Sequence, residues 1–231
     1  MGLKPEDLPL LHCRHQPAWR LVNAKHPPID IFDDVADQAD FDALYAVQTL
    51  TNPRLQTLVG QLNLVPESRR PWGIPGCNYA LGPFVHLNTD GSRFSAGDFG
   101  IFYCAANITT AIAETRYHQQ RYFQQVHGLK YDRIVMRGLK TVFSATLRDL
   151  YPATRFPAQH DADDYHAARA LGDQLRQQDE PGLRYESVRA PGNHCFALLS
   201  PHLIEQVTQS AHYEYIWDGE RISHVLTIRS L

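Results

Sequence analysis

Short runs of β-branched and aromatic residues predict most of the strands of this 231-residue chain. The runs occupy residues 18–22, 101–105, 133–143, 184–189, 195–199, 212–217 and 222–228. Asp218-Gly219 joins the last two runs and is a strong hairpin signal. Residues 84–87 are predicted as one more strand, and residues 1–16 as an extended arm or short turn.

Helically spaced apolar residues predict helices over 40–52, 111–125 and 161–178, with a further short helix over 54–62. Asn107 or Thr109 can accept from the free amides that open the second of these helices. Residues 66–83 are dense in Pro and Gly and are predicted as a structured loop.

The mixture of strands and helices, without a repeat or an obvious linker, predicts one α+β domain over residues 1–231. In this interpretation, residues 1–90 elaborate the front edge of the domain.

Charge and composition exclude several classes of partner. A net charge of −3 and a pI near 6.4 give no electrostatic footprint for nucleic acid or an anionic membrane. No apolar run approaches the ~20 residues of a membrane helix, and the first residues lack the pattern of a signal peptide. We therefore expect a protein of the cytoplasm.

The four cysteines stand far apart, without a C-x-x-C pair, so disulfides are not expected. Cys104 and Cys195 lie in apolar runs and are predicted to be small core residues. His12, Cys13 and His15 lack a second ligand cluster at zinc spacing, so we expect no metal site.

One stretch, residues 91–118, brings a loop arginine, a strand tyrosine and a helix carboxylate into a single strand-turn-helix unit. These residues are Arg93, Tyr103 and Glu114. The arrangement is typical of a functional site, but the spacing of the three residues leaves a simpler, structural interpretation open. Glu114 could be an ordinary helix carboxylate paired with His118 or Arg121, worth about 0.3–0.5 kcal/mol, and Tyr103 a core aromatic.

Two further polar residues lie in predicted strands. Arg20 follows Trp19 in the first strand, where a buried charge needs a partner or a ligand, unless the side chain faces water at an edge. Ser187 lies near the end of the strand predicted over 184–189, and its hydroxyl could simply satisfy a backbone group there.

Five pieces of sequence, in this order, resemble the RES-domain family, named for an Arg, a Glu and a Ser. The pieces are Trp19-Arg20, Gly91-Ser92-Arg93-Phe94-Ser95 with Gly97 and Gly100, Tyr103, Thr110-Ala111-Ile112-Ala113-Glu114, and Tyr185-Glu186-Ser187-Val188-Arg189 with Gly192-Asn193 and the strand 195–199. No single piece is specific, but their order and spacing are, and they cover roughly residues 18 to 205.

The resemblance implies an ADP-ribosyltransferase-like fold, a bent and split β core flanked by helices, with NAD in the cleft. It implies a toxin that degrades NAD at the nicotinamide–ribose bond, by phosphorolysis or hydrolysis. NAD is then a substrate and not a cofactor, and inorganic phosphate is a possible co-substrate. The implied partner is an Xre-like antitoxin that blocks the cleft, and a homodimer within that complex is possible.

By position, Arg20 corresponds to the family's Arg, Glu114 to its Glu and Ser187 to its Ser, while Arg93 and Tyr103 match other site positions. The two arginines are suited to the pyrophosphate or an incoming phosphate, and Glu114 to the positive charge that develops on the ribose. Tyr103 would stack on nicotinamide or bond the ribose. Ser187 would bond a phosphate or ribose oxygen, and it lacks the relay of a nucleophile.

Two other functions stay open on the same scaffold: ADP-ribosyl transfer to a cellular protein, and a catalytically silent module that only binds an antitoxin. Arg189 and His118 are weaker site candidates. Hydride chemistry on NAD is not supported, because no G-x-G-x-x-G follows a strand.

Overall fold

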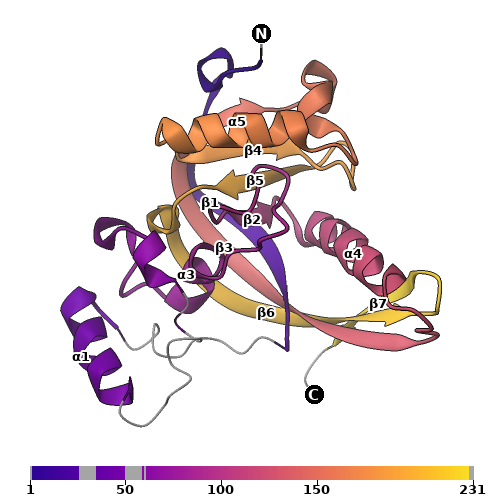
Figure 1. Cartoon of the computed structure of the whole chain (residues 1–231), viewed down its shortest axis with the longest axis horizontal. Helices are drawn as coiled ribbons and strands as arrows, with labels where there is room; N and C mark the ends of the chain where they lie inside the picture. The colour runs from indigo at the N-terminus through magenta and orange to yellow at the C-terminus, as the bar shows by residue number, and fades with distance from the viewer. Residues whose placement is uncertain (1, 26–34, 50–58, 60, 229–231) are drawn as a thin grey trace.

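A strongly bent sheet is the centre of the fold, seen in the computed structural model of residues 2–25, 35–49, 59 and 61–228 (Figure 1). The sheet runs in the order β1, β2, β5, β4, β3, β6 and β7. These strands span Leu10–Asn23, Phe102–Ala105, His194–Leu198, Gly182–Glu186, Asp132–Leu150, Ile204–Trp217 and Ile222–Ile228, respectively. Because β1 also pairs with β3, the first five strands of that order form a closed ring.

The ring is weakest where β1 meets β2. Along one edge, β1 pairs with β3 from Leu10, opposite Arg148, to Asn23, opposite Met136. Along the other edge, it pairs with β2 at one position, Trp19 opposite Ala105. β1 and β2 therefore diverge beside this pair, and the ring is split there.

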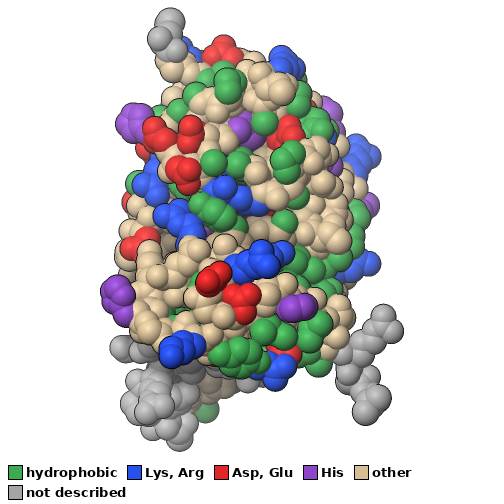
Figure 2. All heavy atoms as spheres, turned by 90° about the vertical axis from the view of Figure 1, so that its right-hand side faces the viewer, with side chains coloured by type: hydrophobic (Ala, Val, Ile, Leu, Met, Phe, Trp, Pro, Cys, Tyr) green, Lys and Arg blue, Asp and Glu red, His purple; other side chains and the backbone are tan. Residues whose placement is uncertain are grey.

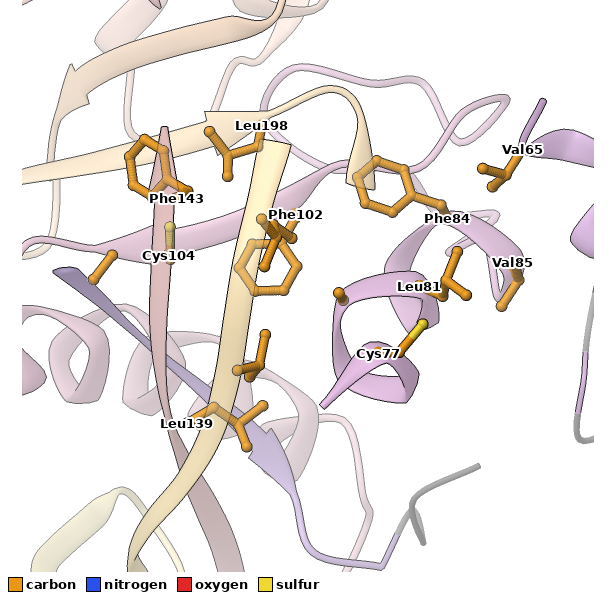
Figure 3. Packing of buried hydrophobic residues seen from close by; sticks show 14 of the residues in the cluster. Val65, Cys77, Leu81, Phe84, Val85, Phe102, Cys104, Leu139, Phe143 and Leu198 are labelled. Atoms are coloured by element: carbon orange, nitrogen blue, oxygen red, sulfur yellow. The ribbon is translucent and has the colours of Figure 1, made fainter. Parts of the chain in front are cut away.

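Helices cover both faces of the sheet, because alternate residues of each strand point to opposite faces. Helix α3 (Cys77–Val85) packs on one face, where its apolar side chains lie beside those of β2, β3 and β5 (Figure 3). Helices α4 (Ile108–Gln124) and α5 (His166–Gln177) pack on the other face. Helix α1 (Gln38–Thr49) joins the α3 side through Phe41, whose ring stacks on Trp72 at 5.2 Å.

The structure confirms the predicted α+β class and a bent sheet flanked by helices. The hairpin at Asp218-Gly219 is confirmed, since β6 and β7 pair antiparallel on either side of it. Two strands are longer than predicted: β1 begins at Leu10, so the expected arm over residues 1–16 is wrong, and β3 continues to Leu150. Both extensions carry polar residues on the outer side of paired strands, which hides the apolar alternation.

The prediction of a loop over 66–83 and a strand over 84–87 is wrong, because α3 occupies the junction between them. The pair Gly82-Pro83 looked like a break, yet apolar residues 77, 80, 81 and 84 have helical spacing and are buried. Gly76 opens the helix with φ +73°, and a Cβ there would lie 2.0 Å from the Val207 carbonyl oxygen. The helix therefore begins where only glycine lets the chain approach β6 so closely.

Three other boundaries move. α5 begins at His166 rather than 161, because the Asp161 carboxylate accepts from the amides of Asp163 and Asp164 and holds a turn there. β4 ends at Glu186, so Ser187 follows the strand. Residues 50–52 of the first predicted helix, and most of the helix predicted over 54–62, lie outside the described residues.

All four cysteines are free and buried, and Cys104 and Cys195 are core residues as predicted. Among the described residues, no helix combines the length and apolar character needed to cross a membrane. In the same part of the chain, no three or more His, Cys, Asp or Glu side chains gather in a way that could hold a metal ion.

Candidate active site

A cleft of about 770 Å³ lies between β1, β2, α4, the loop that precedes β2 and the start of α5. Four of the residues singled out from the sequence line it: Arg20, Arg93, Tyr103 and Glu114. Ser187 does not line the cleft but contacts Glu114 from behind. The structure thus brings all the predicted site residues together, while their action on a substrate stays a prediction.

Glu114 reaches the cleft because of how α4 begins. The Asn107 side chain, one of the two predicted caps, accepts from the Thr110 amide at 2.8 Å, and the helix begins directly after it at Ile108. Ala111, Glu114 and His118 then follow at helical spacing and line the cleft along one face of α4. The strand-turn-helix unit therefore directs Glu114 into the cleft.

Ser187 holds this carboxylate. Its Oγ donates to Glu114 Oε1 at 2.6 Å and accepts from the Ala190 amide at 2.9 Å. Because the amide occupies a lone pair of the hydroxyl, the hydroxyl proton is left to point at Glu114. Both alternatives raised by the sequence are thereby answered: Ser187 satisfies a backbone group and also binds Glu114, and the side-chain hydrogen bond of Glu114 goes to Ser187 instead of His118 or Arg121.

Arg20 bridges the split in the ring. Its Nη1 donates to the Tyr103 carbonyl oxygen at 2.8 Å, and its guanidinium lies 5.0 Å from the centre of the Phe102 ring. Arg20 is half-buried and has a partner on the neighbouring strand, so of the two alternatives raised by the sequence the partnered charge is the one observed. Burial lowers the pKa of the Arg20 guanidinium. Arg20 lines the cleft while joining β1 to β2.

Tyr103 fastens the loop before β2 to the floor of the cleft. Its hydroxyl lies 2.8 Å from Ser92 Oγ and accepts from the Phe94 amide at 3.1 Å. Burial raises the pKa of Tyr103 to about 12, against smaller opposing effects of these hydrogen bonds. The hydroxyl therefore keeps its proton at neutral pH, and it positions the two residues that flank Arg93.

Arg93 is held by a segment that follows it by some distance in the chain. Its Nη1 donates to the carbonyl oxygens of Gln159 and Asp161, at 3.2 and 2.7 Å. The guanidinium also stacks on the Tyr165 ring, 4.5 Å from its centre. One edge of the guanidinium is thus committed to the protein, and the residue lines the cleft from the loop side.

The weaker candidates have different places. His118 lines the cleft, and partial desolvation lowers its pKa, with nearby arginines adding to the effect and Glu114 opposing it. Arg189 stacks on the Tyr117 ring at 3.3 Å and donates to the Ala162 carbonyl oxygen at 2.6 Å. It does not line the cleft but joins α4 to the segment before α5, as a structural residue would.

Several residues that line the cleft were not among the predicted site residues. They are Trp19, Arg121, Tyr122, Asp163, Tyr165 and Arg169. Arg121 and Tyr122 stand seven and eight residues after Glu114 on α4, so the helical period could have found them. Arg169 gave no local signal, because its partners lie 77 and 79 residues away.

Figure 2 shows the side of the molecule that carries α4, where basic and acidic side chains gather across the middle of the face.

Comparison with known proteins is consistent with the pieces quoted above. The family model of the RES domain matches residues 70–218, and the chain belongs to this family. The uncharacterized protein y4oC of Sinorhizobium fredii is 27% identical over 205 residues, which cover 89% of this chain and 84% of that protein. A chain in the crystal structure of the M. tuberculosis MbcT–MbcA toxin–antitoxin complex is 10% identical, with a TM-score of 0.38 over 53% of this chain and 73% of that chain.

Proposed function

We propose that this chain is the toxin of a toxin–antitoxin module and that it removes NAD by breaking the nicotinamide–ribose bond. The observation that carries the proposal is the convergence of Arg20, Arg93, Tyr103 and Glu114 in one cleft, with Ser187 bonded to Glu114. Membership of the RES family supports it, through the ADP-ribosyltransferase-like fold and NAD chemistry that the resemblance implies. We expect the protein to act in the cytoplasm.

Glu114 is the group suited to the bond-breaking step. When nicotinamide leaves with the electron pair of the C–N bond, positive charge develops on the ribose, as in glycoside cleavage. A carboxylate placed in advance stabilises that charge, because no reorganisation is needed at the moment of reaction. The Ser187 bond to Oε1 supplies such placement.

The arginines are suited to the phosphates of the substrate. A guanidinium presents forked N–H donors that match phosphate oxygens, and it stays charged at any physiological pH. Arg20 enters from the split between β1 and β2, and Arg93 from the loop side. A ligand that contacted both would span the floor of the cleft beside Glu114.

The acceptor is an oxygen of inorganic phosphate or of water. Its bond to the ribose carbon replaces the bond to nicotinamide, and the acceptor loses a proton. The products are nicotinamide with ADP-ribose 1-phosphate, or nicotinamide with ADP-ribose. We further propose that an Xre-like antitoxin inhibits the toxin by occupying the cleft, within a complex that holds two copies of this chain.

The deciding experiment incubates the purified protein with NAD, with and without inorganic phosphate, and identifies the products by mass. ADP-ribose 1-phosphate that forms only with phosphate would identify a phosphorylase, and free ADP-ribose in both reactions a hydrolase. Unchanged NAD in both reactions would contradict NAD degradation, and a search for an ADP-ribosylated protein would follow.

A further inference from the structure

We propose that Arg169, on the first turn of α5, is a positioning residue for Arg93: it holds the turn from which Arg93 reaches a phosphate group of the ligand. The identity of that ligand rests on the function proposed above, whereas the contacts that hold the turn do not. The phosphate is either free or part of a nucleotide, and the experiment below separates the two cases.

Arg169 binds the backbone directly before Arg93. Its Nε donates to the Ser92 carbonyl oxygen at 3.0 Å and its Nη2 to the Asp90 carbonyl oxygen at 3.2 Å. These carbonyls stand on either side of Gly91, which has φ +78°. A Cβ at Gly91 would lie 2.7 Å from Arg169 Nη2, so the glycine leaves room for the guanidinium.

A second link between the two arginines passes through an aromatic ring. The Tyr165 ring lies 4.5 Å from the Arg93 guanidinium carbon and 6.0 Å from that of Arg169. Tyr165 precedes Arg169 by one helical turn, and the Arg169 amide donates to the Tyr165 carbonyl oxygen at 2.8 Å. The start of α5 therefore fixes both the turn before Arg93 and the ring on which Arg93 lies.

The same turn is fixed from its opposite side. Arg169 binds the carbonyl oxygen of Ser92, and the Tyr103 hydroxyl binds its Oγ. Further along α5, a Cβ on Gly172 would lie 1.8 Å from the Phe94 carbonyl oxygen, so the helix contacts the loop backbone itself. Tyr103 can keep the loop near the floor without Arg169, but two of the bonds that orient its backbone would be lost.

This placement matters because a guanidinium recognises phosphate through geometry. Two parallel N–H donors must meet two oxygens, and a shift of about 1 Å in a binding group can cost a factor of about 100 in rate. Arg93 already commits Nη1 to the Gln159 and Asp161 carbonyls. Its remaining donors point correctly only while its backbone stays where Arg169 holds it.

The test compares Arg169→Ala with Arg176→Ala, which removes an exposed arginine from the same helix. In Arg169→Ala we expect faster hydrogen exchange at the amides of Ser92 and Phe94, which are bound in the wild type to Ser95 O and Tyr103 Oη. In Arg176→Ala both amides exchange as in the wild type. Wild-type exchange in Arg169→Ala would overturn the proposal, whether or not the protein cleaves NAD.

The consequence for the ligand is measured with Arg93→Ala, Arg169→Ala and the double variant. We expect Arg169→Ala to lower kcat/KM for NAD by about 10- to 100-fold, mainly through KM. The double variant should be no worse than Arg93→Ala alone, because Arg169 acts through Arg93. Losses that multiply would contradict a positioning role and indicate that Arg169 binds the ligand independently.

Two further measurements keep the outcome decisive. If the wild type does not cleave NAD, titration with inorganic pyrophosphate replaces the kinetic cycle. The proposal is supported if Arg93→Ala and Arg169→Ala weaken pyrophosphate binding equally and the double variant weakens it no further. Independent losses in the two single variants would contradict it. A competition experiment between pyrophosphate and NAD separates the two ligands: competition would indicate that Arg93 binds a phosphate of the nucleotide, and simultaneous binding that it binds free phosphate. If Arg169→Ala does not fold, Arg169→Lys takes its place, since an ammonium lacks the planar fork that reaches both carbonyls.

Discussion

The two walls of the cleft are built on different principles. The strand–helix wall, formed by β1, β2 and α4, carries Arg20, Tyr103 and Glu114. The arginine-braced wall consists of residues 88–95, the start of α5, and the segment 157–165 whose carbonyl oxygens bind Arg93; it carries Arg93 and Arg169. Regular secondary structure fixes most of the first wall, with one added bond from Arg20 across the split, whereas the second is fixed mainly by single bonds from arginines to carbonyl oxygens and by the Tyr103 hydroxyl.

Because of this difference, substitutions in the two walls should have different effects: loss of a functional group in the first, and movement of the backbone in the second. Ladder and helix bonds hold β2 and α4 in the strand–helix wall, so substitution of Glu114 there removes a functional group and leaves the backbone in place. The arginine-braced wall depends on a few long-range bonds, so one substitution can move the backbone of a whole loop. The following predictions test the contrast, from the largest expected effect to the smallest.

Glu114→Gln should remove the activity and keep the fold. The amide retains an oxygen that can accept from Ser187 but loses the charge that stabilises the ribose, so we expect turnover of NAD to fall about 100- to 1,000-fold. Turnover is measured by the loss of NAD, and folding by the melting temperature. Glu67→Gln, at an exposed position outside the cleft, is the control. Near-normal turnover in Glu114→Gln would exclude the proposed role of this carboxylate.

Gly172→Ala should break the arginine-braced wall. The added Cβ would lie 1.8 Å from the Phe94 carbonyl oxygen, so α5 must move away from the loop, at a cost of about 1–3 kcal/mol or more in the free energy of unfolding. Urea unfolding measures the loss. Asp173→Ala, at the next position of α5, should change stability by less than about 0.5 kcal/mol. Equal stability of the two variants would show that the loop yields easily.

Ser187→Ala should weaken both stability and activity. Without its Oγ, the Ala190 amide loses its acceptor and Glu114 loses its donor, which we expect to lower stability by about 1–2 kcal/mol and turnover by about 10-fold. Ser200→Ala is the matched control, since Ser200 is also buried but bonds His202 outside the cleft. If both variants lost stability and neither lost turnover, Ser187 would be a purely structural residue.

Acid should loosen the arginine-braced wall through His160. Its Nδ1 lies 2.9 Å from the Phe156 carbonyl oxygen and its Nε2 accepts from the Glu186 amide, so the ring is neutral in the fold. Burial, with Arg93 nearby, lowers the pKa of His160 from its ordinary value of 6.5. As the pH falls below that value, the unfolded chain binds a proton that the folded protein does not.

Stability is therefore lost as the pH drops from about 6.5 toward the pKa of the folded state, by at most about 1.4 kcal/mol per pH unit for this group. Urea unfolding of the wild type and His160→Gln between pH 7.5 and 5 measures the effect. We expect a shallower pH dependence in the variant. The same slope in both proteins would assign the dependence to other histidines.

The sequence predicted the structure correctly wherever residues close together in the chain determine the local conformation. Asn107, β2 and the face of α4 that carries Glu114 follow each other within a short stretch, and local rules place them correctly. Local rules failed at α3, where Gly82-Pro83 concealed a helical period, and at the start of α5, where Asp161 holds a turn instead of the predicted helix. At α3 the close approach of Gly76 to β6 selects the helix, whereas at α5 a local turn held by Asp161 replaces the first turn of the predicted helix.

The sequence by itself determined the α+β class, the strand-turn-helix unit with Arg93, Tyr103 and Glu114, and the resemblance to the RES family. These depend on local periodicity and on the order of residues along the chain. The tertiary structure alone decided that Arg20 fills the split between β1 and β2, that Ser187 holds Glu114, and that Arg169 holds the turn before Arg93. Each of these three bonds joins residues more than 70 positions apart, and no local pattern records such a contact, because it exists only once the sheet has closed.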